Sequence, residues 1–181
     1  FTGEVGDLRV SHGRGFYDAP FLLEISTDTA GATIVYTVDG GVPCDAFGVR
    51  SAGARVYTGP ISVSTTTCVR AAGCRSGWLS TPVQTHTYIF PEAVRHQATD
   101  PTTGAQVVPV GHPSTWPGGS SSGAVTGDYQ VDPDVVGDND KFGGLYRLTF
   151  KDDLKAVPTI SVVMALDDWF GPTGIYINQS Q

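Results

Sequence analysis

The chain has 181 residues, of which 23 are Gly and 12 are Pro, and only 16% are charged. Ordinary domains carry roughly a quarter charged residues, so this composition favours short strands joined by many turns over a helical bundle. The formal net charge of −7 excludes general binding of nucleic acids, because nothing would offset the repulsion of the phosphates. No apolar run is long enough for a membrane span. Because the chain begins with Phe1 and has Met164 as its single Met, we expect a processed product or a fragment.

Residues 16–90 carry the pattern of a β domain. Apolar and polar residues alternate in short runs, and each run ends at a turn signal such as Asp-Gly-Gly or Thr-Gly-Pro. The expected strands lie at 21–26, 33–38, 56–57, 61–63, 68–74 and 83–90. Six or seven short strands in roughly 75 residues predict an all-β fold, a β-sandwich.

The remaining chain, residues 91–181, predicts little regular structure. Pro91 is suited to the first turn of a short helix over 92–97. Residues 100–127, with Gly118–Gly123 at their centre, have the composition of a linker. A second helical stretch is expected at 154–157, and 160–164 is an apolar β run that needs a partner strand. We therefore divide the chain into an extended segment (1–15), a sandwich (16–90) and a long, mostly irregular extension (91–181).

One family resemblance covers the expected sandwich. Residues 36–43 read Tyr-Thr-Val-Asp-Gly-Gly-Val-Pro, and companion motifs follow in order at 57–61, 65–71, 77–80 and 87–88. These motifs resemble the chitobiase/β-hexosaminidase C-terminal domain, also called the fibronectin-type-III-associated repeat. The resemblance implies an immunoglobulin-like sandwich that serves as an accessory module of large secreted or surface proteins, without catalytic residues of its own.

A second resemblance concerns the extension. Residues 128–136, 158–163 and 168–176 resemble a segment that follows this module in planctomycete-type surface proteins, where lamin-tail and spore-coat-kinase-like (CotH) domains often lie nearby. It implies a linker that leads toward a next domain. No kinase residues are carried over to this chain.

Three cysteines permit one disulfide and leave one thiol over. Free thiols are the alternative, and a zinc site is a remote one because the spacing lacks paired cysteines. The alternation in the strand 68–74 predicts that Cys68 and Cys74 both point outward. In an immunoglobulin-like sandwich, this strand and the strand that ends before Cys44 are expected to be antiparallel neighbours. The end of one then lies near the start of the other, which favours Cys44–Cys68 over Cys44–Cys74. A disulfide indicates an oxidising, extracytoplasmic location.

Two further features suggest binding. Five carboxylates within thirteen residues could supply oxygen ligands to calcium, namely Asp128, Asp132, Asp134, Asp138 and Asp140. The alternative is a solvated acidic turn in which Asp132 or Asp134 caps a short helix. Trp116, between Thr115 and Pro117, could stack on a sugar ring, or it could pack structurally.

No motif predicts catalysis. The four histidines lie in unrelated contexts, none beside a Gly-x-Ser-x-Gly elbow, and the Gly118–Ser120 run lacks the Lys of a phosphate-binding loop. We therefore expect a non-enzymatic module of the cell surface or extracellular space, without a cofactor other than a candidate calcium ion. Its extended termini, 1–10 and 160–181, are expected to pair with neighbouring copies or adjacent domains. The alternative is a carbohydrate-binding accessory module that binds polysaccharide.

Overall fold

The computed structural model describes residues 2–116, 123–136 and 141–176, and the chain forms two compact units. The first unit contains Phe1–Phe90 together with Ser161–Ala165. The second contains Pro91–Ile160 and Leu166–Gln181. The chain thus leaves the first unit at Phe90 and returns to it for five residues near its end.

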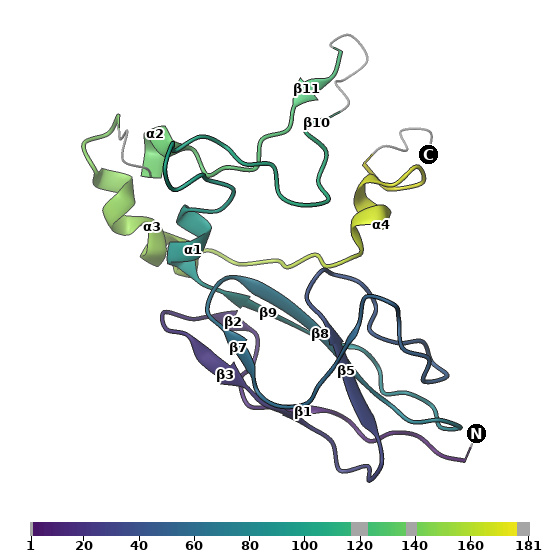
Figure 1. Ribbon diagram of the computed structural model, residues 1–181. Helices are drawn as coiled ribbons and strands as arrows, with labels where there is room; N and C mark the ends of the chain where they lie inside the picture. The colour runs from purple at the N-terminus through teal and green to yellow at the C-terminus, as the bar shows by residue number, and fades with distance from the viewer. Residues whose placement is uncertain (1, 117–122, 137–140, 177–181) are drawn as a thin grey trace. The chain divides into compact units, whose positions relative to one another are not determined.

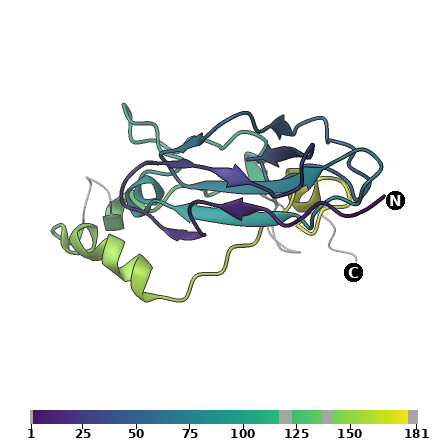
Figure 2. The same cartoon turned by 90° about the horizontal axis from the view of Figure 1, so that it is seen from below.

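The main sheet of the first unit has five strands in the order β2-β9-β8-β5-β6. They are β2 (Gly15–Phe16), β5 (Thr33–Thr37), β6 (Arg55–Val56), β8 (Thr67–Cys74) and β9 (Gln84–Ile89). All neighbours are antiparallel except β2, which runs parallel to β9. In Figure 2 the two longest strands, β8 and β9, lie side by side across the view. The first unit is mostly β, as expected from the alternation.

Two short strand pairs complete the first unit. β1 (Arg9–Val10) pairs with β4 (Ile25–Ser26), and β3 (Phe21–Leu23) pairs with β7 (Ile61–Val63). The single strand expected at 21–26 is therefore divided at Glu24, and its two halves have different partners. The alternation itself is confirmed, since Leu23 and Ile25 are buried whereas Leu22 is exposed.

The core of the first unit is centred on Tyr88, which is fully buried together with Leu23, Val63 and Val69. Its hydroxyl donates to the carbonyl of His12 over 2.9 Å, so the buried phenol keeps a partner. Its ring packs against a group of aromatic side chains, and the same burial raises the pKa of the phenol. The rings that line this part of the core are His12, Tyr17, Phe21, His86 and Phe90.

The N-terminal segment has its pairing partners within its own unit. Thr2 donates its backbone N–H to Gly77, Val5 donates to Leu79, and Leu79 donates in return to Gly3, each over 2.9 Å. Residues 9–10 then form β1. The segment therefore packs as part of the first unit, with Val5 and Leu8 buried.

The second unit is sparse in regular structure, as predicted, but it holds more helix than expected. Its elements are α1 (Pro91–Arg95), β10 (Thr115–Trp116), β11 (Val125–Thr126), α2 (Pro133–Val136), α3 (Leu145–Ala156) and α4 (Leu166–Phe170). The helix expected to begin at Pro91 is confirmed. Of the linker expected over 100–127, residues 117–122 lie outside the described residues, and the described remainder holds only the short strands β10 and β11.

Helix α3 corrects the expectation of a helical stretch at 154–157. It begins at Leu145, directly after Gly144, whose positive φ of 83° marks the start. Tyr146, Phe150 and Leu154 recur at intervals of four residues, which is the helical period. This period was overlooked in a segment rich in charged residues. No side chain of α3 is fully buried.

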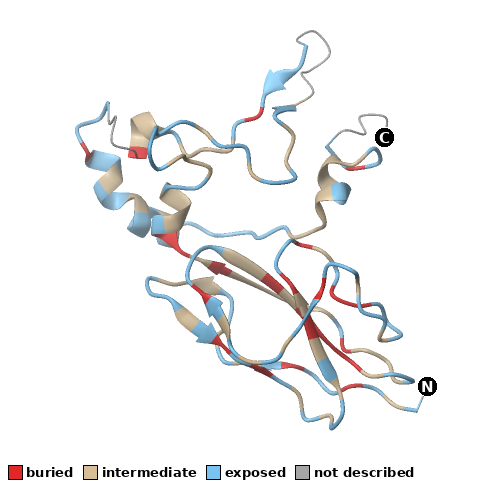
Figure 3. Ribbon diagram, in the orientation of Figure 1, coloured by how far each residue is buried: buried red, intermediate tan, exposed pale blue. Residues whose placement is uncertain are grey.

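Burial and charge differ between the two units. In the described part of the second unit, Val136 and Pro91 are the apolar side chains that are buried, whereas the first unit holds most of the buried residues of the described chain (Figure 3). The first unit has seven acidic and six basic residues, and the second has eleven and five. Nearly all of the net negative charge therefore belongs to the second unit.

Candidate functional site

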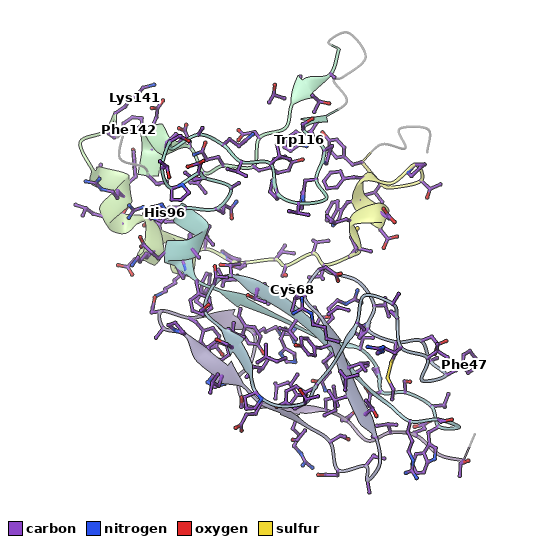
Figure 4. All side chains as sticks on the ribbon, in the orientation of Figure 1. Phe47, Cys68, His96, Trp116, Lys141 and Phe142 are labelled. Carbon is purple, nitrogen blue, oxygen red and sulfur yellow. A yellow bond between two sulfur atoms is a disulfide. The ribbon has the colours of Figure 1, made fainter. Side chains whose placement is uncertain are left out.

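A disulfide joins Cys44 to Cys74, and both residues are buried. The expected pairing of Cys44 with Cys68 is therefore wrong, and Cys68 carries a free thiol. Figure 4 shows the sulfur–sulfur bond on the side of the first unit that also carries Phe47. One disulfide and one remaining thiol were expected from the cysteine count.

The register of β5 and β8 shows why the pairing was misjudged. The two strands are antiparallel neighbours, as expected, and the end of β5 at Thr37 lies opposite Arg70. However, the chain does not stop there: after the Asp39–Gly41 turn it doubles back toward the other end of β8. Cys44 therefore lies with Val35 and Ala72 in the cluster that contains Cys74.

The returning loop is held by local polar contacts. The carboxylate of Asp45 accepts the backbone N–H groups of Phe47 and Val49 over 2.9 and 2.8 Å, an Asx-type turn. Ser51 donates its N–H to the carbonyl of Pro43 over 3.0 Å. Asp45 directly follows Cys44, so the sequence carries a local signal for a turn at the point where the chain folds back.

Cys68 lies on β8 opposite Thr87 of β9 and is half-buried. Burial raises the pKa of its thiol, so the protonated form is favoured and the thiolate that reacts as a nucleophile is disfavoured. Its position thus fits a packing role better than a reactive one.

The structure describes three members of the acidic segment, Asp128, Asp132 and Asp134. Asp132 accepts the N–H of Asp134 over 2.8 Å and so caps α2, which confirms the capping alternative. Asp134 forms an ion pair with Lys141, and Asp128 is exposed. Asp138 and Asp140 lie outside the described residues. Within residues 2–116, 123–136 and 141–176, no group of three or more His, Cys, Asp or Glu residues could hold a metal ion.

Trp116 lies half-buried in an aromatic cluster of the second unit. Its indole N–H donates to the hydroxyl of Tyr129 over 2.9 Å, and that hydroxyl donates to the carbonyl of Pro113 over 2.7 Å. The neighbouring rings have centroids 5.2–5.9 Å apart and tilted or edge-on planes. The members of the cluster are His112, Trp116, Tyr129, Phe170 and Tyr176. The indole N–H therefore has its hydrogen-bond partner within the chain. The cluster forms a local core in a unit with few other buried side chains among its described residues.

Glu92 joins α1 to α3 in the second unit. One of its oxygens lies 2.9 Å from the ammonium group of Lys151, and the other lies 3.4 Å from Arg95 and 3.3 Å from His96. The hydrogen bond from Lys151 is the main reason that the pKa of this carboxyl is lowered. The glutamate was part of the expected helix, but its role as a cross-link depends on a lysine 59 residues later and could not be read from the sequence.

A segment with exposed apolar side chains follows α3. Residues 157–164 are extended in Figure 1, and Ile160 is 87% and Val162 59% exposed. No backbone group of residues 158–164 has a backbone hydrogen-bond partner among the described residues. The segment is tied to the first unit by the hydroxyl of Ser161, which lies 2.7 Å from that of Thr87. The β run expected at 160–164 is thus extended, and its partner strand is not found within the described chain.

Met164 forms the second point of attachment. Its carbonyl oxygen points at Gly40, where an added Cβ would collide with it, and the φ of 83° at Gly40 independently favours glycine. The carbonyl of Gly40 in turn accepts a hydrogen bond from the Arg70 guanidinium over 2.6 Å. The turn after β5 is thereby fixed beneath the extended segment.

The comparisons with known proteins agree with part of this picture. Residues 13–85 match the family of the chitobiase/beta-hexosaminidase C-terminal domain. Neither the comparison with curated proteins nor that with solved structures found a match. In the described part of the chain, no helix is long and apolar enough to cross a membrane. The family resemblance seen in the motifs of residues 36–88 is therefore confirmed for the first unit, and the resemblance of the extension stays a prediction.

Proposed function

We propose that this chain is a non-catalytic structural module of the cell surface or extracellular space, with an immunoglobulin-like sandwich as its first unit, and that it assembles with other protein by adding a strand to its extended segment. The observation that carries the proposal is the segment 157–164, which is apolar, extended and without a backbone partner among the described residues. An exposed strand of this kind is a template for pairing with another chain.

The remaining features support the same proposal. The buried disulfide between Cys44 and Cys74 is typical of proteins in oxidising compartments. The match of residues 13–85 to a domain found at the C-terminal part of larger enzymes supports an accessory role. The N-terminal segment was expected to assemble in the same way, but its backbone is already paired within the first unit, so the assembly role passes to residues 157–164.

The proposal is tested by measuring the mass of the purified full chain by light scattering at increasing concentration. We expect concentration-dependent oligomers that are lost on Val162→Asp, because the substitution places a charge in the pairing segment. Val110→Asp is the matched control, since Val110 is 97% exposed and lies far along the chain from the segment. A monomer at every concentration, or equal loss in both variants, contradicts the proposal.

A carbohydrate-binding role is the second candidate, and the aromatic cluster around Trp116 favours it. Trp116 is half-buried and Tyr176 is 37% exposed, so part of each ring is accessible for stacking on a sugar. Trp116→Ala should weaken binding of a polysaccharide in a pull-down, whereas Tyr129→Phe, which removes the hydrogen bond from Trp116 but keeps the ring, should not. Equal binding by both variants contradicts this candidate.

A further inference from the structure

We infer that the partner of the extended segment is the same segment of a second copy, paired antiparallel about Ser161. The inference rests on the proposed assembly function and specifies its partner, edge and register. In this arrangement residue 160 of one copy lies opposite residue 162 of the other, and the interface has two-fold symmetry.

The first argument identifies which edge of the segment is available. In an extended chain the N–H and C=O groups of one residue point to the same edge, and successive residues point to opposite edges. The carbonyl of Met164 points at Gly40, so the edge that Met164 shares with residues 158, 160 and 162 is blocked at Met164. The N–H and C=O groups of Thr159, Ser161 and Val163 point away from it. This second edge is the one open to a partner.

The second argument concerns Pro158. A proline has no N–H group and cannot donate to a sheet. Pro158 is six residues from Met164 and so belongs to the same edge of the extended segment, which means that its missing donor does not weaken the open edge. Pairing about Ser161 joins the open edges of two copies through residues 159, 161 and 163, with about six backbone hydrogen bonds.

The side chains agree with this register. Antiparallel pairing about Ser161 places Ile160 opposite Val162 twice, once on each side of the two-fold axis. These two side chains are 87% and 59% exposed in the single chain. They occupy non-hydrogen-bonded positions, where the side chains of opposite residues approach most closely. The pairing thus covers the two largest apolar exposures of the segment with each other.

Charge favours the antiparallel direction. Residues 156–166 carry no charge, and they are flanked by Lys155 on one side and by Asp167 and Asp168 on the other. Antiparallel pairing about Ser161 brings the lysine of one copy toward the aspartates of the other. Parallel pairing would instead bring like charges together at both ends, which is unfavourable.

The test uses register-specific cross-linking of the full chain. Two variants are made in a Cys68→Ser background, which removes the free thiol: Ile160→Cys and Val162→Cys. Mixed and mildly oxidised, they should form covalent dimers at least about tenfold faster than either alone, because only the mixture places two thiols opposite each other. Val110→Cys in the same background measures random collision. Melting curves of each variant confirm that the fold is kept.

The outcomes separate the inference from the proposed function. Preferential cross-linking of the mixture, together with dimers of the unmodified chain in light scattering, supports both. Oligomers without preferential cross-linking overturn the inference and leave assembly through another partner surface. A chain that stays monomeric and cross-links no faster than Val110→Cys overturns both.

Discussion

The loop closed by the disulfide between Cys44 and Cys74 predicts how far the free energy of unfolding falls when the bond is reduced. It closes a loop with a sequence separation of 30 residues. In the chain-entropy model, a loop of this length stabilises the folded state by about 3.6 kcal/mol. Reducing the bond should therefore lower the free energy of unfolding by about that amount, which is a large part of the stability of a small domain.

The measurement is urea unfolding of the full chain, followed by circular dichroism, with and without reductant. The Cys68→Ser variant is used in both arms, so that the disulfide is the one covalent difference. The urea midpoint should fall by about 1.2–3.6 M for slopes of about 1–3 kcal/mol/M, which are typical of small proteins. A loss below about 1 kcal/mol would refute the entropic reasoning. Because a Cys44–Cys68 bond would close a loop of similar size, the pairing itself is checked by alkylating the unreduced chain, in which Cys68 should be the labelled residue.

Other substitutions test individual contacts. Thr81→Val should cost about 1–3 kcal/mol in urea unfolding, because it leaves the buried N–H of Gly73 without its 2.9 Å acceptor. Gly40→Ala should destabilise the first unit in melting curves, whereas Gly59→Ala, at a site with open space, should cost less. Glu92→Gln should cost no more than about 1 kcal/mol, because the ion pairs are half-exposed. Because the pKa of Glu92 is lower in the folded chain than in the unfolded chain, its ionised carboxylate stabilises the fold at pH values above the unfolded pKa. This stabilisation should be lost as the pH falls through the pKa of the folded chain. The Glu92→Gln variant should lack that pH dependence. Burial lowers the pKa of His86, so stability should also fall below a pH of about 6.5, where the unfolded imidazole takes up a proton, and His86→Phe should remove this loss.

The alternation of apolar residues was sufficient to predict most strands of the first unit. Strand signals are local, so β5, β7, β8 and β9 were expected within one or two residues of their observed bounds. The alternation also assigned Cys74 to the outer face of β8, and there it was misleading. Ala72 and Cys74 are buried because the loop after β5 folds back over that face.

Features that depend on distant residues were not predictable in the same way. The Glu92–Lys151 contact, the collision that excludes a side chain at Gly40, and the ring cluster around Trp116 each join segments far apart in the sequence. Sequence spacing identified Trp116 and the acidic segment as candidate sites. The three-dimensional structure shows that the indole N–H and two of the carboxylates already have partners in the chain.

The extended segment lacks, within the described chain, the features that usually prevent an exposed strand from pairing with another chain, and this supports its role in assembly. Proteins usually shield an exposed strand with a proline on the open edge, a charge within the strand or a covering element. In residues 158–164 the one proline lies on the same edge as Met164, and there is no charged side chain. The open edge of Thr159, Ser161 and Val163 therefore lacks each of these devices within the described chain. Ser161 and Met164 hold the segment in place, and its other edge keeps backbone N–H and C=O groups that are unpaired among the described residues. A strand that is both held in place and unpaired on one edge is ready to form backbone hydrogen bonds with a partner strand.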